Sequence, residues 1–169
     1  MPRFTLSDFC FVSIHDIGIM KTIITYLPAI IALGIFTTAP AEEAVTLEIT
    51  GNDLMQFSTK ELKVKSGQEV TLKLKHTGML PKAAMGHNVV ILQAGVAMAA
   101  FATKSMTAAA TDYLPEDEES KNQILVATKM LGGGEETEIK FTAPAAGEYA
   151  FLCTFPGHFA IMNGKLIVE

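Results

Sequence analysis

Alternation of apolar and polar residues, which begins at residue 44, constrains the fold of this chain more than any other feature. In residues 45–50 the sequence VTLEIT places an apolar side chain at every second position. The same alternation returns in residues 70–75 and, over a shorter run, in residues 61–65. A period of two is typical of a strand that is buried on one face only. The chain is therefore expected to fold as short strands that share a core.

Turn residues separate the alternating runs, notably Gly51-Asn52-Asp53, Ser66-Gly67, residues 132–134, residues 144–147 and Asn163-Gly164. Strands are expected at 45–50, 61–65, 70–75, 87–92, 123–128, 136–141, 148–153 and 165–168. This spacing predicts an all-β protein, a Greek-key sandwich or barrel of seven to eight strands. Residues 95–110 are rich in Ala and Met and do not alternate, so one helical insertion is expected there. The acidic cluster at residues 116–119 is interpreted as a solvated loop or the start of a helix or strand.

The first 41 residues have the features of an export signal. Met20-Lys21 precedes an apolar run at residues 23–36, and an Ala-Pro-Ala sequence ends at Ala41. Translation is expected to begin at Met20 and cleavage to follow Ala41, so that residues 42–169 form a single exported domain in the periplasm. The alternative, a retained membrane anchor, is disfavoured because Pro28 and Gly34 interrupt a run shorter than the roughly 20 apolar residues of a membrane span.

The cysteine content narrows the function further. Of the two cysteines, Cys10 lies in the segment expected to be removed, so the exported domain keeps only Cys153. A free thiol in an oxidising compartment is usually paired or damaged, and metal ligation would protect it. The formal net charge of −5 disfavours nucleic acid and anionic membranes as partners, and no stable membrane insertion of the exported domain is expected.

One ten-residue segment, CTFPGHFAIM, brings together a thiolate (Cys153), an imidazole (His158) and a thioether (Met162). A second imidazole, His87, stands far upstream in the sequence MGHN. Two His, one Cys and a weak axial Met make up the ligand set of a blue-copper site. Taken singly, Cys153 and Met162 could be core residues and His87 a loop histidine. Their joint spacing favours copper, since a strand that ends at Cys153 and turns at Pro156-Gly157 can fold a loop around one ion.

The chain resembles the cupredoxin family, and within it the azurins, from about residue 44 to its end. The resemblance is carried by GNDLMQF at residues 51–57, LPK at 80–82, MGHN at 85–88, DYL at 112–114 and CTFPGH at 153–158. It implies one type 1 copper held by His87, Cys153 and His158, with Met162 as a long axial ligand and the Gly86 carbonyl on the opposite side. It also implies that the backbone amides of Asn88 and Phe155 hydrogen-bond to the cysteine sulfur.

The same resemblance implies electron transport rather than enzymatic catalysis. The outer edge of the His158 ring is expected to approach solvent within an apolar docking patch made of Leu80, Ala84, Met85, Phe155 and Pro156, to which Phe159 is added. The expected partners are c-type cytochromes and periplasmic reductases or peroxidases, and the protein is expected to be a monomer. The sequence does not choose among these partners.

Three departures from the azurin pattern concern stability and docking rather than copper. Val45 and Gly67 stand where azurins have a disulfide, Val89 replaces a core tryptophan, and Phe159 stands where a small residue is common. His76 aligns with a histidine that lies near the copper without binding it. This residue could titrate and shift the reduction potential, or it could be packed and neutral.

Two other functions remain open. A copper carrier or storage protein would bind the metal without rapid redox turnover, but such proteins favour exposed Met-rich or Cys-rich sites. A thiol enzyme would use Cys153 as nucleophile and His158 as base. That hypothesis leaves His87 and Met162 without a role.

Overall fold

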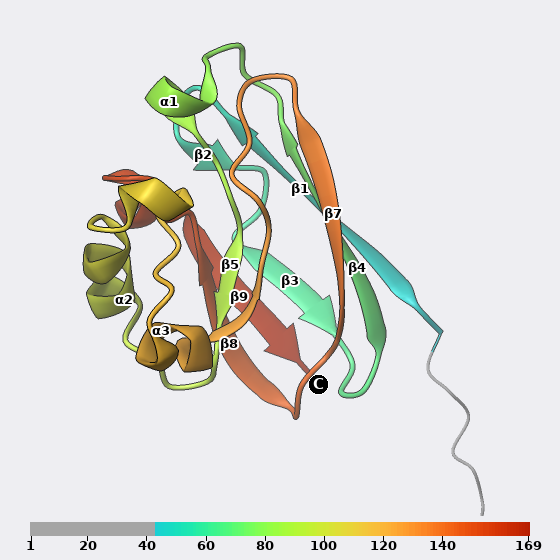
Figure 1. Cartoon of the computed structure of the whole chain (residues 1–169). Helices are drawn as coiled ribbons and strands as arrows, with labels where there is room; N and C mark the ends of the chain where they lie inside the picture. Colours follow the sequence, from blue (N-terminus) through green and yellow to red (C-terminus); the bar gives the residue numbers. More distant parts are fainter. Residues whose placement is uncertain (1–42) are drawn as a thin grey trace, which may run out of the picture. The chain divides into compact units, whose positions relative to one another are not determined.

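The structure is a computed structural model that describes residues 43–169. The predicted export signal at residues 1–41, its start at Met20 and Cys10 lie outside the described residues. Two sheets face each other, one with the strand order β2-β1-β4-β7 and one with the order β3-β9-β8-β5-β6 (Figure 1). The strands are β1 (Val45–Asn52), β2 (Gln56–Phe57), β3 (Glu61–Val64), β4 (Glu69–His76), β5 (Val90–Leu92), β6 (Ile124–Ala127), β7 (Glu136–Thr142), β8 (Gly147–Leu152) and β9 (Asn163–Val168).

The predicted two-sheet β-sandwich is confirmed. Each of the eight expected segments forms a strand, and the two-residue β2 is a ninth that was not predicted. The segment expected to begin at His87 starts only at Val90, because the backbone of His87 instead pairs with Leu131 in an isolated bridge. The shortened strand, β5, pairs with β6 in antiparallel orientation.

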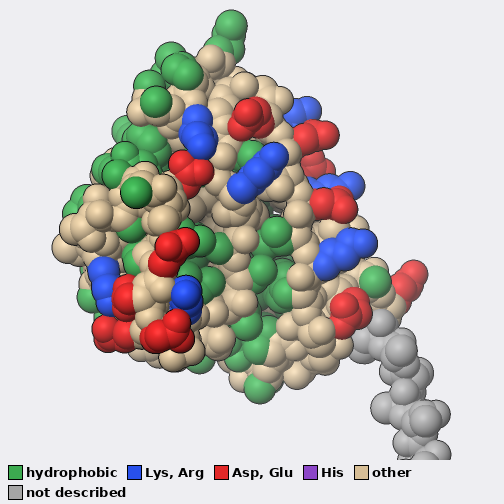
Figure 2. Space-filling view, in the orientation of Figure 1, with side chains coloured by type: hydrophobic (Ala, Val, Ile, Leu, Met, Phe, Trp, Pro, Cys, Tyr) green, Lys and Arg blue, Asp and Glu red, His purple; other side chains and the backbone are tan. Residues whose placement is uncertain are grey.

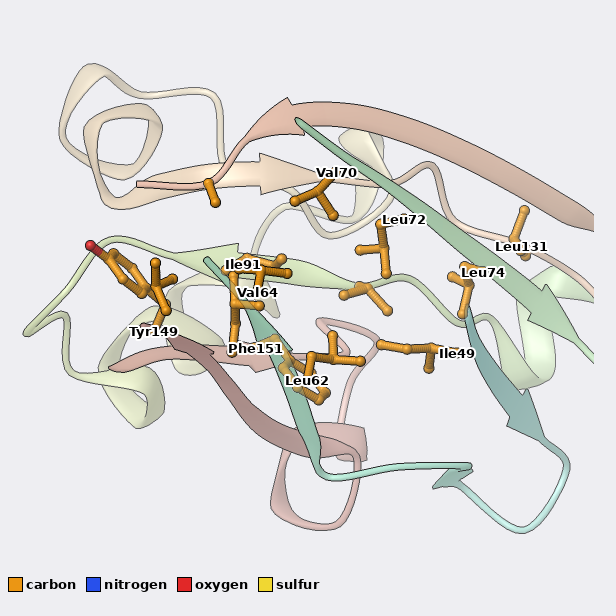
Figure 3. Close-up of a cluster of buried hydrophobic side chains, with 14 residues drawn as sticks. Ile49, Leu62, Val64, Val70, Leu72, Leu74, Ile91, Leu131, Tyr149 and Phe151 are labelled. Atoms are coloured by element: carbon orange, nitrogen blue, oxygen red, sulfur yellow. The ribbon is translucent and has the colours of Figure 1, made fainter. Parts of the chain in front are cut away.

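The core lies between the two sheets (Figure 3). β4 alternates as the sequence predicts, with Val70, Leu72 and Leu74 buried and Lys73 exposed. Ile49 of β1 is fully buried beside them, and side chains from β3, β5 and β8 meet them from the facing sheet. The burial of this alternating set is the main source of stability.

The outer face of the first sheet carries charges in matching rows. Lys73 of β4 lies opposite Glu48 of β1 on one side and Glu138 of β7 on the other. Lys75 likewise lies opposite Glu136. Opposite charges directly across strands favour this register over a shifted one.

The helices lie mainly on the long excursion between β5 and β6 (Figure 1). The predicted insertion contains α2 (Met98–Ser105) and a 3-10 turn, η1 (Ala109–Thr111). Phe101 and Ala102 of α2 pack on Val90, Leu92 and Leu152 in a second apolar cluster. Not predicted were α1 (Lys82–Met85) and η2 (His158–Ala160), both at the end of the sandwich that carries the CTFPGH segment.

The acidic cluster begins a helix, α3 (Glu118–Gln123), which is one of the alternatives expected for it. The Asp117 side chain accepts a hydrogen bond from the Ser120 backbone N–H and so caps the helix. Glu118 and Glu119 lie in the first turn, where their charges interact favourably with the helix dipole.

Three of the predicted turn signals overlap strands. Gly51 and Asn52 end β1, Gly147 begins β8, and Asn163 and Gly164 begin β9. At Gly164 the need for glycine comes from close packing, because a Cβ there would lie 2.3 Å from the Phe151 ring and 2.4 Å from the Lys60 carbonyl oxygen. Glycine therefore marks a tight contact at this position and not a reversal of the chain.

Candidate metal centre

Three potential metal ligands converge at one end of the sandwich. The ligand atoms of His87, Cys153 and His158 all lie within 4.8 Å of one another, although His87 is 66 residues from Cys153 in the chain. Nδ1 of His158 is 3.6 Å from the Cys153 sulfur, and Nδ1 of His87 is 4.0 Å from it. The donor set predicted from the sequence is thus brought together in space.

Short, hydrogen-bonded segments position these donors. His87 lies between α1 and β5 and exchanges both backbone hydrogen bonds with Leu131. Cys153 follows β8, and His158 begins η2. The loop between them closes on itself, because the Met162 N–H donates to the His158 carbonyl and the Cys153 N–H donates to the Met162 carbonyl. The three donors therefore stand on a fixed backbone.

The separations of the donor atoms fit one bound metal ion. With metal–nitrogen bonds of about 2.0 Å and metal–sulfur bonds of about 2.3 Å, a trigonal plane separates sulfur from nitrogen by roughly 3.8 Å. The observed separations of 3.6 and 4.0 Å lie on either side of that value. A mixed set of two imidazoles and one thiolate is the in-plane set of blue-copper sites.

The His87 ring is fixed by contacts on several sides. Its Nε2 lies 2.9 Å from the Asn52 carbonyl oxygen. A carbonyl oxygen can only accept, so Nε2 carries the proton and donates a hydrogen bond to that oxygen. That leaves the lone pair on Nδ1, the atom that faces the sulfur. The ring also approaches Gly51 closely, since a Cβ at Gly51 would lie 2.8 Å from Cδ2 of His87. Gly51 was expected to form a turn but lies in β1, and this contact explains the glycine.

The His158 ring is held differently. It packs against the Phe155 ring, with centroids 4.6 Å apart, and against the His87 ring at 5.1 Å. Among residues 43–169, no group hydrogen-bonds with its Nε2, whereas every fully buried side-chain nitrogen or oxygen there has a partner. Nε2 must therefore reach the surface, although His158 as a whole is only 3% exposed. This ring edge can therefore approach solvent over only a small area.

Burial sets the protonation of all three donors in the metal-free protein. It raises the pKa of the Cys153 thiol to about 11, so the sulfur carries its proton at neutral pH. It lowers the pKa of His158 to about 4, with the nearby His87 and His76 adding to the effect. Burial likewise lowers the pKa of His87. Both imidazoles are thus neutral and able to ligate, and a metal must displace only the thiol proton.

The cysteine sulfur has three backbone neighbours. The Gly86 carbonyl oxygen lies 3.7 Å from it, and the backbone amides of Asn88 and Phe155 hydrogen-bond to it, which opposes the rise in its pKa. The Asn88 side chain also joins the two halves of the site. Its amide donates to the Thr154 hydroxyl, and its carbonyl accepts from the Thr154 N–H.

The structure places Met162 and Gly86 beside these donors. Met162 is fully buried, and its methyl carbon would lie 3.4 Å from a Cβ at Gly51, next to the His87 ring. A glycine at position 86 lets the backbone come close to a metal without a clash with a Cβ. The structure adds a second reason, because a Cβ at Gly86 would lie 2.7 Å from the Lys82 carbonyl oxygen and 3.0 Å from the Met130 side chain.

The predicted docking residues come from two neighbouring segments at this end. Leu80, Ala84 and Met85 lie in or just before α1, with Leu80 and Ala84 exposed and Met85 half-buried. The other three, Phe155, Pro156 and Phe159, come from the segment that carries His158 and are half-buried. Phe159 packs on the second apolar cluster, so only part of its ring can face a partner. In Figure 2, apolar side chains gather along the edge that carries α1, and the charges lie mostly over β7 and α3.

His76 is buried behind His87 and stacks on its ring with centroids 4.3 Å apart. Its Nδ1 accepts a hydrogen bond from the Gly78 N–H, and its Nε2 lies 2.8 Å from the Met85 carbonyl oxygen. Both ring nitrogens are therefore engaged. This arrangement favours the alternative in which His76 is a packed residue with fixed partners.

Sequence reasoning did not find several residues that support the site. Asn52 and Thr154 lie inside the motifs that carry the family resemblance, but their roles depend on contacts with His87 and Asn88, which are 35 and 66 residues away. Met130, buried against Gly86, lies in no motif. The position of Thr154, a polar residue directly after the candidate ligand Cys153, was the one available signal.

Residues 43–169 match the model for copper-binding proteins of the plastocyanin/azurin family. The chain belongs to this family. It is 47% identical over 126 residues to outer membrane protein H.8 of Neisseria meningitidis, a match that covers 73% of this chain and 66% of that protein, so it spans just under two thirds of that relative. It is 44% identical over 128 residues to azurin of Alcaligenes faecalis, with coverage of 73% and 97%.

Solved structures of family members share the fold. Auracyanin of Roseiflexus castenholzii superposes with a TM-score of 0.66 at 38% identity, covering 75% of this chain and 98% of that one. Auracyanin A of Chloroflexus aurantiacus, described as a blue copper protein, gives a TM-score of 0.65 at 38% identity, with coverage of 75% and 99%. The predicted cofactor, copper, and the predicted cupredoxin class are thereby confirmed.

Two further points separate this family member from the expected azurin pattern. Cys153 is the lone cysteine of the described residues, so no internal disulfide can form among them. Val89, in the place of the tryptophan, is fully buried in the main core.

Within residues 43–169, no helix has the length and apolar character needed to cross a bilayer.

Proposed function

We propose that this chain is an exported, periplasmic, monomeric carrier of single electrons that uses one type 1 copper. In this proposal Nδ1 of His87, Nδ1 of His158 and the Cys153 sulfur would hold the copper, with Met162 as a weak further ligand and the Gly86 carbonyl as a weak contact. Bound copper supplies the one-electron couple between Cu(I) and Cu(II). The observation that carries the proposal is the preformed cluster of three donors within 4.8 Å, buried and hydrogen-bonded into place.

The protein's part is to keep that geometry unchanged while the charge of the site changes. The His87 ring is held by Asn52 and His76, and the segment from Cys153 to Met162 is closed by its own backbone hydrogen bonds. Ligands that do not move require little reorganisation on electron transfer. The amides of Asn88 and Phe155 stabilise negative charge on the sulfur and thereby influence the reduction potential.

The electron is proposed to leave through His158. Its Nε2 reaches the surface, whereas Nε2 of His87 is hydrogen-bonded inside the protein. The apolar residues around it, Met85 and Phe155 among them, form the contact surface for partner redox proteins. c-type cytochromes and periplasmic reductases or peroxidases are the partners we propose. The name of the H.8 relatives, outer membrane protein, supports export.

The two alternative functions are disfavoured by specific observations. A copper carrier must release its metal readily, but His87 and Cys153 are fully buried and His158 is nearly so. A thiol enzyme requires a thiolate, but burial raises the pKa of Cys153 to about 11 and lowers the pKa of His158, the base in that hypothesis, to about 4.

Electron self-exchange tests the proposed exit, because each molecule then serves as the partner of another. Met85→Lys places a charge in the docking patch without changing a ligand. We expect the self-exchange rate to fall about tenfold or more, since desolvating an unpaired polar group costs roughly 1–3 kcal/mol. The absorption spectrum should remain that of the wild type.

Ala146→Lys is the matched control, because it adds the same charge to an exposed position just before β8, at the end of that strand opposite Cys153. Its self-exchange rate should stay close to that of the wild type. Equal rates in all three proteins would show that electrons leave elsewhere. Equal slowing by both lysines would indicate a general effect of charge.

A further inference from the structure

Two consecutive residues next to the copper end have an unusual backbone conformation. Asp112 and Tyr113, which follow η1, have φ angles of 52° and 61°. This left-handed region is unfavourable for residues with a side chain, and especially for an aromatic one. The Tyr113 N–H donates to the Ala108 carbonyl and closes the turn. Such strain persists only where surrounding contacts enforce it, and it concentrates at functional sites.

The side chains of these two residues contact two segments that are distant in the sequence. Both carboxylate oxygens of Asp112 accept hydrogen bonds from Nζ of Lys82, at 3.0 and 2.9 Å. The Tyr113 ring lies edge-on against the Phe155 ring, with centroids 5.3 Å apart and an interplanar angle of 69°. The strained turn is therefore held between α1 and the segment that carries His158.

Each of those contacts leads to a proposed copper ligand. Lys82 begins α1, which ends at Met85 directly before Gly86 and His87. Phe155 packs on the His158 ring, with centroids 4.6 Å apart. The Tyr113 ring thus contacts the Phe155 ring, which in turn contacts the His158 ring.

The His158 ring needs such support more than the His87 ring does. A metal-binding imidazole is usually oriented by a hydrogen bond from its second nitrogen. His87 has that bond, to Asn52, but Nε2 of His158 has no such partner among the described residues. Ring packing must supply the missing restraint.

We infer that the Asp112–Tyr113 turn, clamped by Lys82, is a positioning device that fixes the His158 ring through Phe155. Its residues do not touch the metal and act only through the ligand. The inference rests on the ligand set proposed above. It assigns a role at the copper site to the helical excursion, which otherwise lies outside the sandwich.

Tyr113→Leu tests this role, because it removes the ring but keeps an apolar side chain at a half-buried position. Copper affinity should fall about tenfold, the lower end of the losses seen when the support of a metal ligand is removed. In the metal-free protein, the NMR signals of the His158 ring should broaden or double. Tyr113→Phe keeps the ring and should restore both properties.

The ion pair provides a second test should Tyr113→Leu not fold. Lys82→Met and Asp112→Asn should each weaken copper binding measurably, by about two- to fivefold, the range of an exposed ion pair. Lys104→Met is the control, because it removes an equivalent pair with Asp117 in the same excursion without touching Phe155 or α1. It should leave copper affinity unchanged.

Tyr149→Leu controls for a general loss of stability, since Tyr149 is buried and its hydroxyl donates to the Ala145 carbonyl just before β8, at the end of that strand opposite Cys153. It should lower the unfolding temperature without altering copper affinity or the His158 signals. If Tyr113→Leu folds, wild-type copper affinity together with sharp His158 signals would overturn the proposed positioning role. If Tyr113→Leu does not fold, wild-type copper affinity and sharp His158 signals in both ion-pair variants would overturn it. A wild-type protein without a thiolate-to-copper absorption band would instead refute the ligand set itself.

Discussion

The two ends of the sandwich are built from the same strands but differ in what they bury: apolar side chains at one end and polar side chains at the other. Towards the start of β8, the space between the sheets is filled by apolar side chains such as Val64 and Val70 (Figure 3). At the copper end, buried polar side chains take over, namely His76, His87, Asn88, Thr128, Thr154 and His158. Each finds a partner within the protein or reaches the surface. Burying polar groups costs stability unless they are paired, so the apolar part supplies the stability that the copper end requires.

The first prediction concerns the apolar part. Leu72 is fully buried at the middle of β4, between Leu47 and Ile139 on the neighbouring strands. Leu72→Ala should lower the free energy of unfolding by about 2–5 kcal/mol because it leaves a cavity. The spectrum of the copper-loaded protein should not change. A shifted spectrum would show that the two ends are not independent.

Copper removal acts on the other end. The metal would join His87 to the segment from Cys153 to Met162 and would bind the folded state only, which adds about 2.7 kcal/mol at a free copper concentration 100-fold above the dissociation constant. Calorimetry should therefore show a lower unfolding temperature for the metal-free protein. Without a disulfide among the described residues, the dependence should exceed that of azurins that have one, where such a bridge typically contributes about 2–4 kcal/mol. Identical midpoints would contradict the proposed ligands.

How much the sequence predicts also differs between the two ends. The apolar part was predictable, because period-two alternation is local and β4 alternates as expected. The grouping of the proposed ligands Cys153, His158 and Met162 was predictable because these residues lie within ten positions of one another. The contacts that hold the His87 ring were not predictable, because its hydrogen-bond partner, the Asn52 carbonyl, lies 35 residues away in the sequence. Glycines misled for the same reason: Gly51 and Gly164 are required by contacts with distant residues, but alone they indicate turns.

The smallest expected effect lies in the helical excursion. Hydrogen bonds from Lys104 and then Ser120 lower the pKa of Asp117 to about 2 from its ordinary 3.8. Because the pKa is lower in the folded state, the carboxylate stabilises the α3 cap at pH above 3.8, and this contribution is lost as the pH falls towards 2. Hydrogen-exchange protection of the α3 amides should fall over that interval. Asp117→Asn should reduce that dependence, while Glu116→Gln, at a neighbouring exposed acid, should keep it. A copper spectrum altered by Asp117→Asn would show that this part of the excursion is not separate from the site.

The central claim is that the Cys153 sulfur binds copper together with the two imidazoles. Titrating the metal-free protein with Cu(II) and recording the visible absorption spectrum tests it most directly. The wild type should develop a strong thiolate-to-copper charge-transfer band in the red that saturates at one equivalent. Cys153→Ser should remain folded and show no such band. A colourless wild type, or a Cys153→Ser variant that turns blue, would contradict the account.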